Sequence, residues 1–99
     1  PAITLLDLDH NITYINRTVP DLTIEDVIGT PIYDFLPDES KTKMKKNLEF
    51  VAETAEEIQI ETEYRTIKGE SRTFQSFIGP VNSSNKVIGL TVVSRDISI

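Results

Sequence analysis

The sequence predicts an α+β domain in which a five-stranded antiparallel sheet carries its helices on one face. Three observations support this prediction. Residues 58–65 alternate between core-compatible and polar side chains, as in a strand with one wet face. Residues 40–57 carry apolar side chains at helical spacing. Residues 87–97 form a long run rich in β-branched side chains, which favours a further strand.

The N-terminal part of the chain is expected to form a hairpin. Residues 3–8 are apolar and partly alternating, and residues 12–15 are β-branched or aromatic. Asp9, His10 and Asn11 supply turn-forming side chains between them. We therefore expect His10 to lie in an exposed turn.

Two short helices are predicted next. Thr23 is positioned to cap a turn of helix over residues 24–28, which Gly29 ends. Pro31 suits the first turn of a second short helix over residues 32–36.

The longest helix is predicted to begin with Asp38 or Ser40 as its cap and to run to about Glu57. The side chains that would form its buried stripe are Met44, Leu48, Val51 and Ala55.

The C-terminal half of the chain is predicted to form three strands. After the strand over residues 58–65, residues 68–70 turn the chain into a second strand over residues 73–78. Residues 79–85 are rich in Gly, Pro, Asn and Ser and predict a loop before the last strand, residues 87–97.

Length and composition limit what the chain can do. Its 99 residues suffice for one domain, residues 1–99. The net charge of −6 opposes binding to nucleic acid or to an anionic membrane surface. No apolar run is long enough to span a bilayer, so we expect a cytoplasmic domain without direct membrane contact.

Four short strings resemble the PAS domain family. Residues 6–16 resemble its opening hairpin, and residues 27–36 resemble the stretch that leads into its long helix. Residues 67–70 match its turn between the third and fourth strands. Residues 94–98, Ser-Arg-Asp-Ile-Ser, resemble the Asp-Ile-Thr ending of many such domains, with Ser98 in the place of Thr.

This resemblance implies a sheet of strand order 2-1-5-4-3 and a cavity between the sheet and the helices. It also implies a role as the sensory or dimerisation module of a multidomain signalling protein, from which residues 1–99 would be an excised piece. In prokaryotes the attached output of such proteins is most often a histidine kinase, which would place the chain in a two-component phosphorelay.

The cavity would be lined by the sheet side chains that face the long helix, with Phe35 and Leu48 closing the opposite wall. Hydroxyl groups in such a wall are candidate ligand contacts, because a buried hydroxyl without a partner costs about 1–3 kcal/mol. A filled core with no ligand would show the same pattern, and this alternative stays open. The candidate residues on the sheet are Tyr64, Thr62, Ser76, Ser94, Ile60, Phe74, Leu90 and Val92.

The composition argues against the cofactors known in this family. The chain has no Cys, which excludes a flavin adduct and a coumarate thioester. Haem in the family is usually bound through a His on the long helix, whereas the single His of this chain is His10. We predict no metal and no cofactor, and an unidentified small molecule remains possible as ligand.

Asp96 and Arg95 end the last strand, where the family passes its signal to the next helix. Asp96 could pair with a basic side chain near this exit and couple the strand to the output. The alternative is a solvated strand end, which would contribute at most about 1 kcal/mol.

Two other functions are alternatives to ligand sensing. The first is a small enzyme, in which Asp7 or Asp34 works with Tyr14 or Tyr64 as an acid and base pair. No nucleophile or phosphate-binding motif supports it, so we do not expect an enzyme.

The second is a spacer that binds no ligand and forms a homodimer through its sheet face and flanking helices. The strand over residues 87–93 is apolar on both sides, which predicts an exposed patch on the sheet. Charging Val87 or Val93, whichever faces outward, should then favour the monomer.

Overall fold

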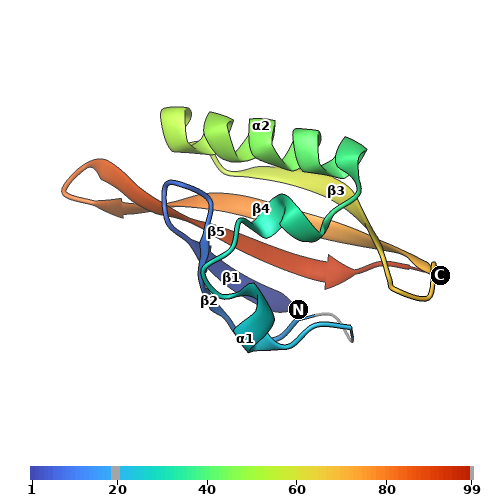
Figure 1. The fold of residues 1–99 in the computed structure, drawn as a ribbon. Helices are drawn as coiled ribbons and strands as arrows, with labels where there is room; N and C mark the ends of the chain where they lie inside the picture. Colours follow the sequence, from blue (N-terminus) through green and yellow to red (C-terminus); the bar gives the residue numbers. More distant parts are fainter. Residues whose placement is uncertain (19–20, 99) are drawn as a thin grey trace.

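The structure is a computed structural model that describes residues 1–18 and 21–98. A five-stranded antiparallel sheet has the order β2-β1-β5-β4-β3, and the helices gather on one of its faces (Figure 1). This confirms the predicted architecture and the strand order that the family resemblance implied. In chain order the elements are β1 (Ala2–Leu6), β2 (Ile12–Ile15), α1 (Ile24–Val27), the 3-10 helix η1 (Ile32–Phe35), α2 (Asp38–Thr54), β3 (Ile58–Arg65), β4 (Ser71–Ser83) and β5 (Lys86–Asp96).

The turn between β1 and β2 is held by the side chain of Asp7. One carboxylate oxygen accepts hydrogen bonds from the backbone N–H groups of Asp9 and Asn11, both at 2.9 Å. His10, between them, has a φ of 71° and is only 7% exposed. Our expectation of an exposed His10 was therefore wrong. The turn folds its imidazole onto Tyr33, with the two rings edge to face at 5.6 Å.

The short helices begin as expected, and each ends one residue earlier than predicted, at Val27 and Phe35. The Thr23 side chain accepts a hydrogen bond from the Asp26 backbone, and the Asp26 carboxylate accepts one from the Thr23 backbone, which completes a capping box. Gly29 follows the helix with a φ of 85°, a conformation that glycine adopts without steric cost. The second helix, after Pro31, is a single 3-10 turn.

Helix α2 differs from the prediction at both ends. Pro37 is its N-cap residue and no side chain caps it, so neither Asp38 nor Ser40 has the expected role. The helix ends at Thr54, because Ala55 has a left-handed φ of 58°. Ser40 is instead buried against the sheet.

Ser40 and Lys43 bind the free edge of β3. The Glu63 backbone N–H donates to Ser40 Oγ at 3.2 Å, and Lys43 Nζ donates to the Glu61 backbone oxygen at 2.7 Å. β3 is the last strand of the sheet, so these groups have no partner strand on that side. The start of α2 therefore satisfies backbone groups that an edge strand leaves open.

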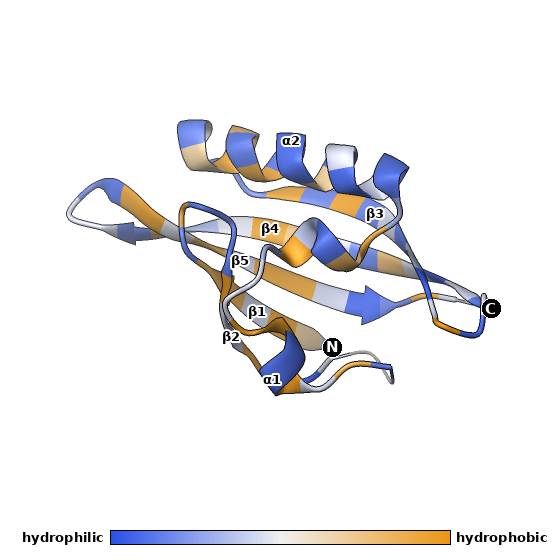
Figure 2. Cartoon of the chain, in the orientation of Figure 1, coloured by the Kyte–Doolittle hydropathy of each residue, from blue (hydrophilic) through white to orange (hydrophobic). Residues whose placement is uncertain are grey.

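The hydrophobic core lies between α2 and the sheet. Figure 2 shows that the apolar residues of α2 turn toward the strands. Leu48 and Val51 are fully buried there, in one cluster with residues of the sheet. The sheet residues of this core include Ile60, Ile78, Leu90 and Val92.

Strand β4 is longer than predicted. It continues through Gly79 and Pro80 to Ser83, where we expected a loop. The partner strand β3 begins at Ile58, opposite Ile78, so this last part of β4 pairs with β5 alone. A proline is tolerated at such an edge because no ladder hydrogen bond is needed on the open side. The turn itself lies at Ser84 and Asn85, whose φ values are 50° and 64°.

The two faces of β5 have different surroundings. Leu90 and Val92 are fully buried on the side of the helices. Val93 lies opposite both Ile3 and Phe77 on the other face, while Val87 packs against the core. Val93 is therefore the outward residue of the two that the sequence singled out. Among the described residues, no helix is long and apolar enough to cross a membrane.

Candidate ligand-binding cavity

A cavity of about 530 Å³ lies between the inner face of the sheet and the helices η1, α1 and α2. Its wall combines side chains from the central strands with side chains from the helices and from β2. Most of this wall is apolar; the apolar side chains include Ile12, Val27, Ile32, Phe35, Met44 and Phe74.

Hydroxyl groups gather on the sheet side of the cavity. Ser76 on β4 lies opposite Ser94 on β5, and their Oγ atoms are 2.7 Å apart. Each hydroxyl can take part in more than one hydrogen bond, so this pair retains capacity for a ligand. Thr4, Thr62 and Tyr64 also line the cavity.

Tyr64 is a hydrogen-bond donor in this wall. Burial raises the pKa of its phenol, and the negative charge of Asp21 raises it further. Tyr64 therefore keeps its proton at neutral pH and can donate it to an acceptor on a ligand.

The structure divides the ten predicted contact residues into two groups. Leu48, Ile60, Leu90 and Val92 lie in the packed core and are not part of the cavity wall, so we remove them from the candidate contacts. The six that line the cavity are Tyr64, Thr62, Ser76, Ser94, Phe35 and Phe74.

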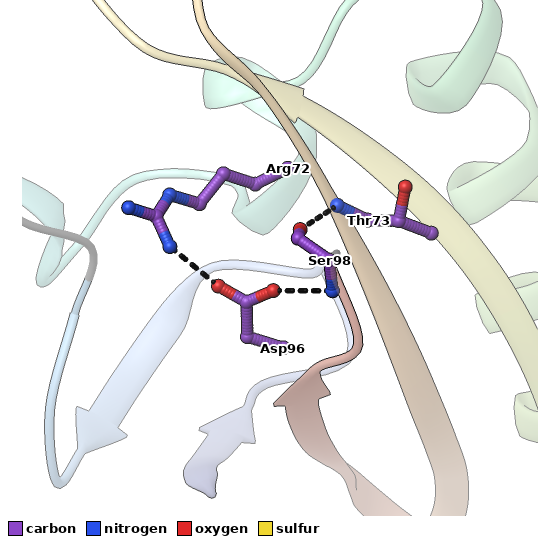
Figure 3. A network of polar contacts seen from close by, with 4 residues as sticks. All are labelled: Arg72, Thr73, Asp96 and Ser98. Carbon is purple, nitrogen blue, oxygen red and sulfur yellow. Dashed lines mark hydrogen bonds and ion pairs between the residues drawn. The ribbon is translucent and has the colours of Figure 1, made fainter.

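Arg72 and Asp96 form an ion pair at the mouth of the cavity. Arg72 Nη1 lies 2.8 Å from Asp96 Oδ2, and both residues line the cavity. Figure 3 shows how the pair continues into the chain after β5: Ser98 donates its backbone N–H to Asp96, and its Oγ accepts from the Thr73 backbone. The hydrogen bonds from Ser98, followed by the Arg72 guanidinium, lower the pKa of Asp96 to about 2.

Arg95 has a different position from Asp96. It borders the cavity, yet it lies opposite Gln75 on the strand parity that turns away from the helices. Of the two predicted relay residues, Asp96 is the one that is hydrogen-bonded, to Arg72 and to Ser98.

Sequence reasoning missed Arg72, Arg17 and Thr4 as residues of the cavity wall. Arg72 could have been found, because it shares strand parity with Phe74 and Ser76. The predicted strand began at residue 73, two residues after β4 begins at Ser71, and therefore left Arg72 out. Arg17 follows β2 in an irregular segment, and no periodic signal marks its direction.

The acid and base pairs that an enzyme would need do not meet in this cavity. Tyr64 lines it, but Asp7 is engaged in the β1–β2 turn and Asp34 is exposed on η1. Tyr14 lies opposite Leu5 and is 51% exposed.

The comparison with known families decides the assignment. The model of the PAS fold matches residues 1–99, which is the whole chain. The chain belongs to the PAS family. As a PAS domain it is a sensory module rather than an enzyme. No curated protein sequence matches it significantly.

Solved PAS domains share the fold of this one. The PAS domain of a Colwellia psychrerythraea protein has 20% sequence identity and a TM-score of 0.82, over 98% of this chain and 86% of that one. The PAS domain of the Cronobacter turicensis quorum-sensing receptor RpfR, in complex with C12:0, has 24% identity and a TM-score of 0.81, over 98% and 93%. The Vibrio cholerae VqmA dimer, a LuxR-type receptor, has 18% identity and a TM-score of 0.81, over 98% and 46%.

Proposed function

We propose that this PAS domain senses a small, mostly apolar molecule in the cavity between its sheet and its helices. The observation that carries the proposal is the cavity itself, about 530 Å³ with an apolar wall and a few hydroxyl groups. Ligand sites in proteins have this size and character, with volumes of about 300–1,000 Å³. The RpfR domain, of the same fold, is described in complex with C12:0, and VqmA is described bound to DPO.

The signal would leave the domain through Asp96. This residue touches the cavity mouth through Arg72 and the chain after β5 through Ser98. A ligand that moves Arg72 therefore changes the contacts of the segment that would lead to the output domain. The proposed relay follows one connected set of hydrogen bonds, from Arg72 through Asp96 to Ser98.

We propose a histidine kinase in the same cytoplasmic polypeptide as the output. A DNA-binding output is the second possibility, since VqmA is described as a receptor with target DNA. Autophosphorylation of the parent polypeptide with labelled ATP tests the kinase. A parent that binds DNA and incorporates no phosphate would contradict it.

The sensing proposal is tested by native mass spectrometry of freshly purified protein. We expect an additional bound mass, and a melting temperature that rises with the concentration of the identified compound. Ser94→Leu, which places a larger side chain in the cavity, should abolish both. Ser83→Leu is the matched control, because Ser83 is exposed at the far end of β4. Equal binding by both variants would exclude the cavity as the site.

A spacer that dimerises without ligand is a second candidate, favoured by the outer face of the sheet. This outer patch is apolar and partly exposed, and it consists of Ile3, Leu5, Tyr14, Phe77 and Val93. A patch of this kind is typical of an interaction surface. We propose that a homodimer uses it together with the flanking helices.

A further inference from the structure

The charge at the cavity is opposite in sign to the charge of the chain. The protein has a net charge of −6, with sixteen acidic residues. One of these, Asp96, lines the cavity, whereas three of the four arginines, Arg17, Arg72 and Arg95, do so. The cavity therefore combines an apolar interior with a rim at which arginines outnumber carboxylates among the lining residues, while Asp21 and Glu70 also act on Arg72 from nearby.

Arg17 is the least constrained of these cations. It is exposed, and it has no carboxylate within ion-pair distance among residues 1–18 and 21–98. An exposed arginine keeps its charge at every physiological pH and can bind an anion through two parallel N–H donors.

Arg72 is held in place but keeps spare donors. Its one ion pair uses Nη1, at 2.8 Å from Asp96. A guanidinium has five N–H donors, so the remaining ones are available for a second acceptor. Because Asp96 is fixed by Ser98, the direction of Arg72 is set before any ligand arrives.

Arg95 also lines the cavity, but its side chain points in a different direction from those of Arg17 and Arg72. Its position on β5 turns its side chain toward the outer face of the sheet. We therefore assign the cavity mouth to Arg17 and Arg72.

We propose that the ligand of this cavity is an amphiphilic anion, with an apolar body among the inner side chains and one carboxylate or similar group bound by Arg17 and Arg72. This rests on the proposed sensing function and narrows it to one chemical class. A neutral ligand would leave these two arginines unused, and a cationic one would be repelled by them.

Three compounds with the same ten-carbon chain test the proposal: decanoate, 1-decanol and decylammonium. Their affinities for the intact domain are measured by calorimetry below the micellar concentrations. We expect decanoate to bind about tenfold tighter than 1-decanol, and decylammonium to bind most weakly. The advantage of decanoate should shrink as salt is added, because exposed charges are screened.

Arginine variants show which residue causes the preference for decanoate over 1-decanol. Arg17→Gln should remove most of the preference for decanoate while 1-decanol binds as before. Arg65→Gln is the matched control: it removes the same charge from an exposed arginine that does not line the cavity, and should leave all three affinities unchanged.

The outcomes separate the two proposals. If 1-decanol binds as tightly as decanoate, or if Arg65→Gln acts like Arg17→Gln, the anionic class is wrong and the cavity remains a ligand site. If none of the three compounds binds, both the class and the sensing of an apolar molecule by this cavity are contradicted.

Discussion

The pair of Arg72 and Asp96 joins the cavity mouth to the segment after β5. Both side chains are about one third exposed, so solvent screens their attraction and the pair stabilises the fold only modestly. The pair matters for the position of the chain after β5, because the same carboxylate also accepts a hydrogen bond from the Ser98 backbone.

The Asp96→Asn variant should lower the free energy of unfolding at neutral pH by no more than about 1 kcal/mol. The folded-state pKa of Asp96 is lowered from 3.8 to about 2, so its contribution is present above pH 3.8 and is lost as the pH falls toward 2. Urea unfolding across this range should therefore show a shallower acid limb in the variant. Glu63→Gln is the control, since its pair with Arg65 is long, at 3.7 Å.

His10 should make stability depend on pH near neutrality. Burial lowers its pKa below 6.5, so the unfolded chain takes up a proton that the folded chain resists. Stability should fall as the pH drops below this value. His10→Asn, which tolerates a positive φ, should flatten that dependence between about pH 7.5 and about pH 5.5 in denaturant titrations. An unchanged slope would contradict this assignment.

Among single residues, sequence reasoning found four hydroxyl groups of the cavity wall but missed Thr4, Arg17 and Arg72. Thr62, Tyr64 and Ser76 follow from strand alternation alone. The burial of His10 depends on contact with Tyr33, which is 23 positions away, and local pattern contains no such information.

Among the elements, helix α2 contributes fully buried side chains to the hydrophobic core. Leu48→Ala should cost about 2–5 kcal/mol, because Leu48 is fully buried between the helix and the sheet. Phe50→Ala, two residues along the same helix, should cost much less, since Phe50 is 41% exposed. Thermal unfolding of both variants measures the difference. Equal losses would mean that α2 packs with another face.

The elements were predictable where their pattern was regular. β3 alternates strictly, and its predicted bounds, residues 58–65, are those of the structure. The end of β4 was missed because Gly79 and Pro80 are usual loop residues, and only the register shows that they lie at an open edge. The cap of α2 was missed because Ser40 has a tertiary partner, the Glu63 backbone.

For the whole molecule, the outer patch predicts self-association. Val93→Lys places a charge at its centre, between Ile3 and Phe77, and should raise the fraction of monomer in sedimentation equilibrium. Ser83→Lys adds the same charge at an exposed site away from the patch and should not. An unchanged monomer fraction in Val93→Lys would remove the patch as a dimer interface.

The overall architecture was predictable because element order at this length leaves few ways to bury one helix on one sheet. The size of the cavity could not be predicted from the sequence. A wall of apolar and hydroxyl side chains is compatible with a filled core, and the structure places the empty volume near Phe35 and Phe74 while Leu48 is packed.

The contacts of Ser40 and Lys43 with β3 affect how such modules behave when many are crowded together. With Glu61 and Glu63 already engaged, the outer margin of the sheet offers fewer bonding groups to a strand from another molecule. At the opposite margin the Ile12 backbone is bonded to Thr30 and Gly29. These contacts reduce the number of free backbone groups through which two copies of this domain could pair edge to edge.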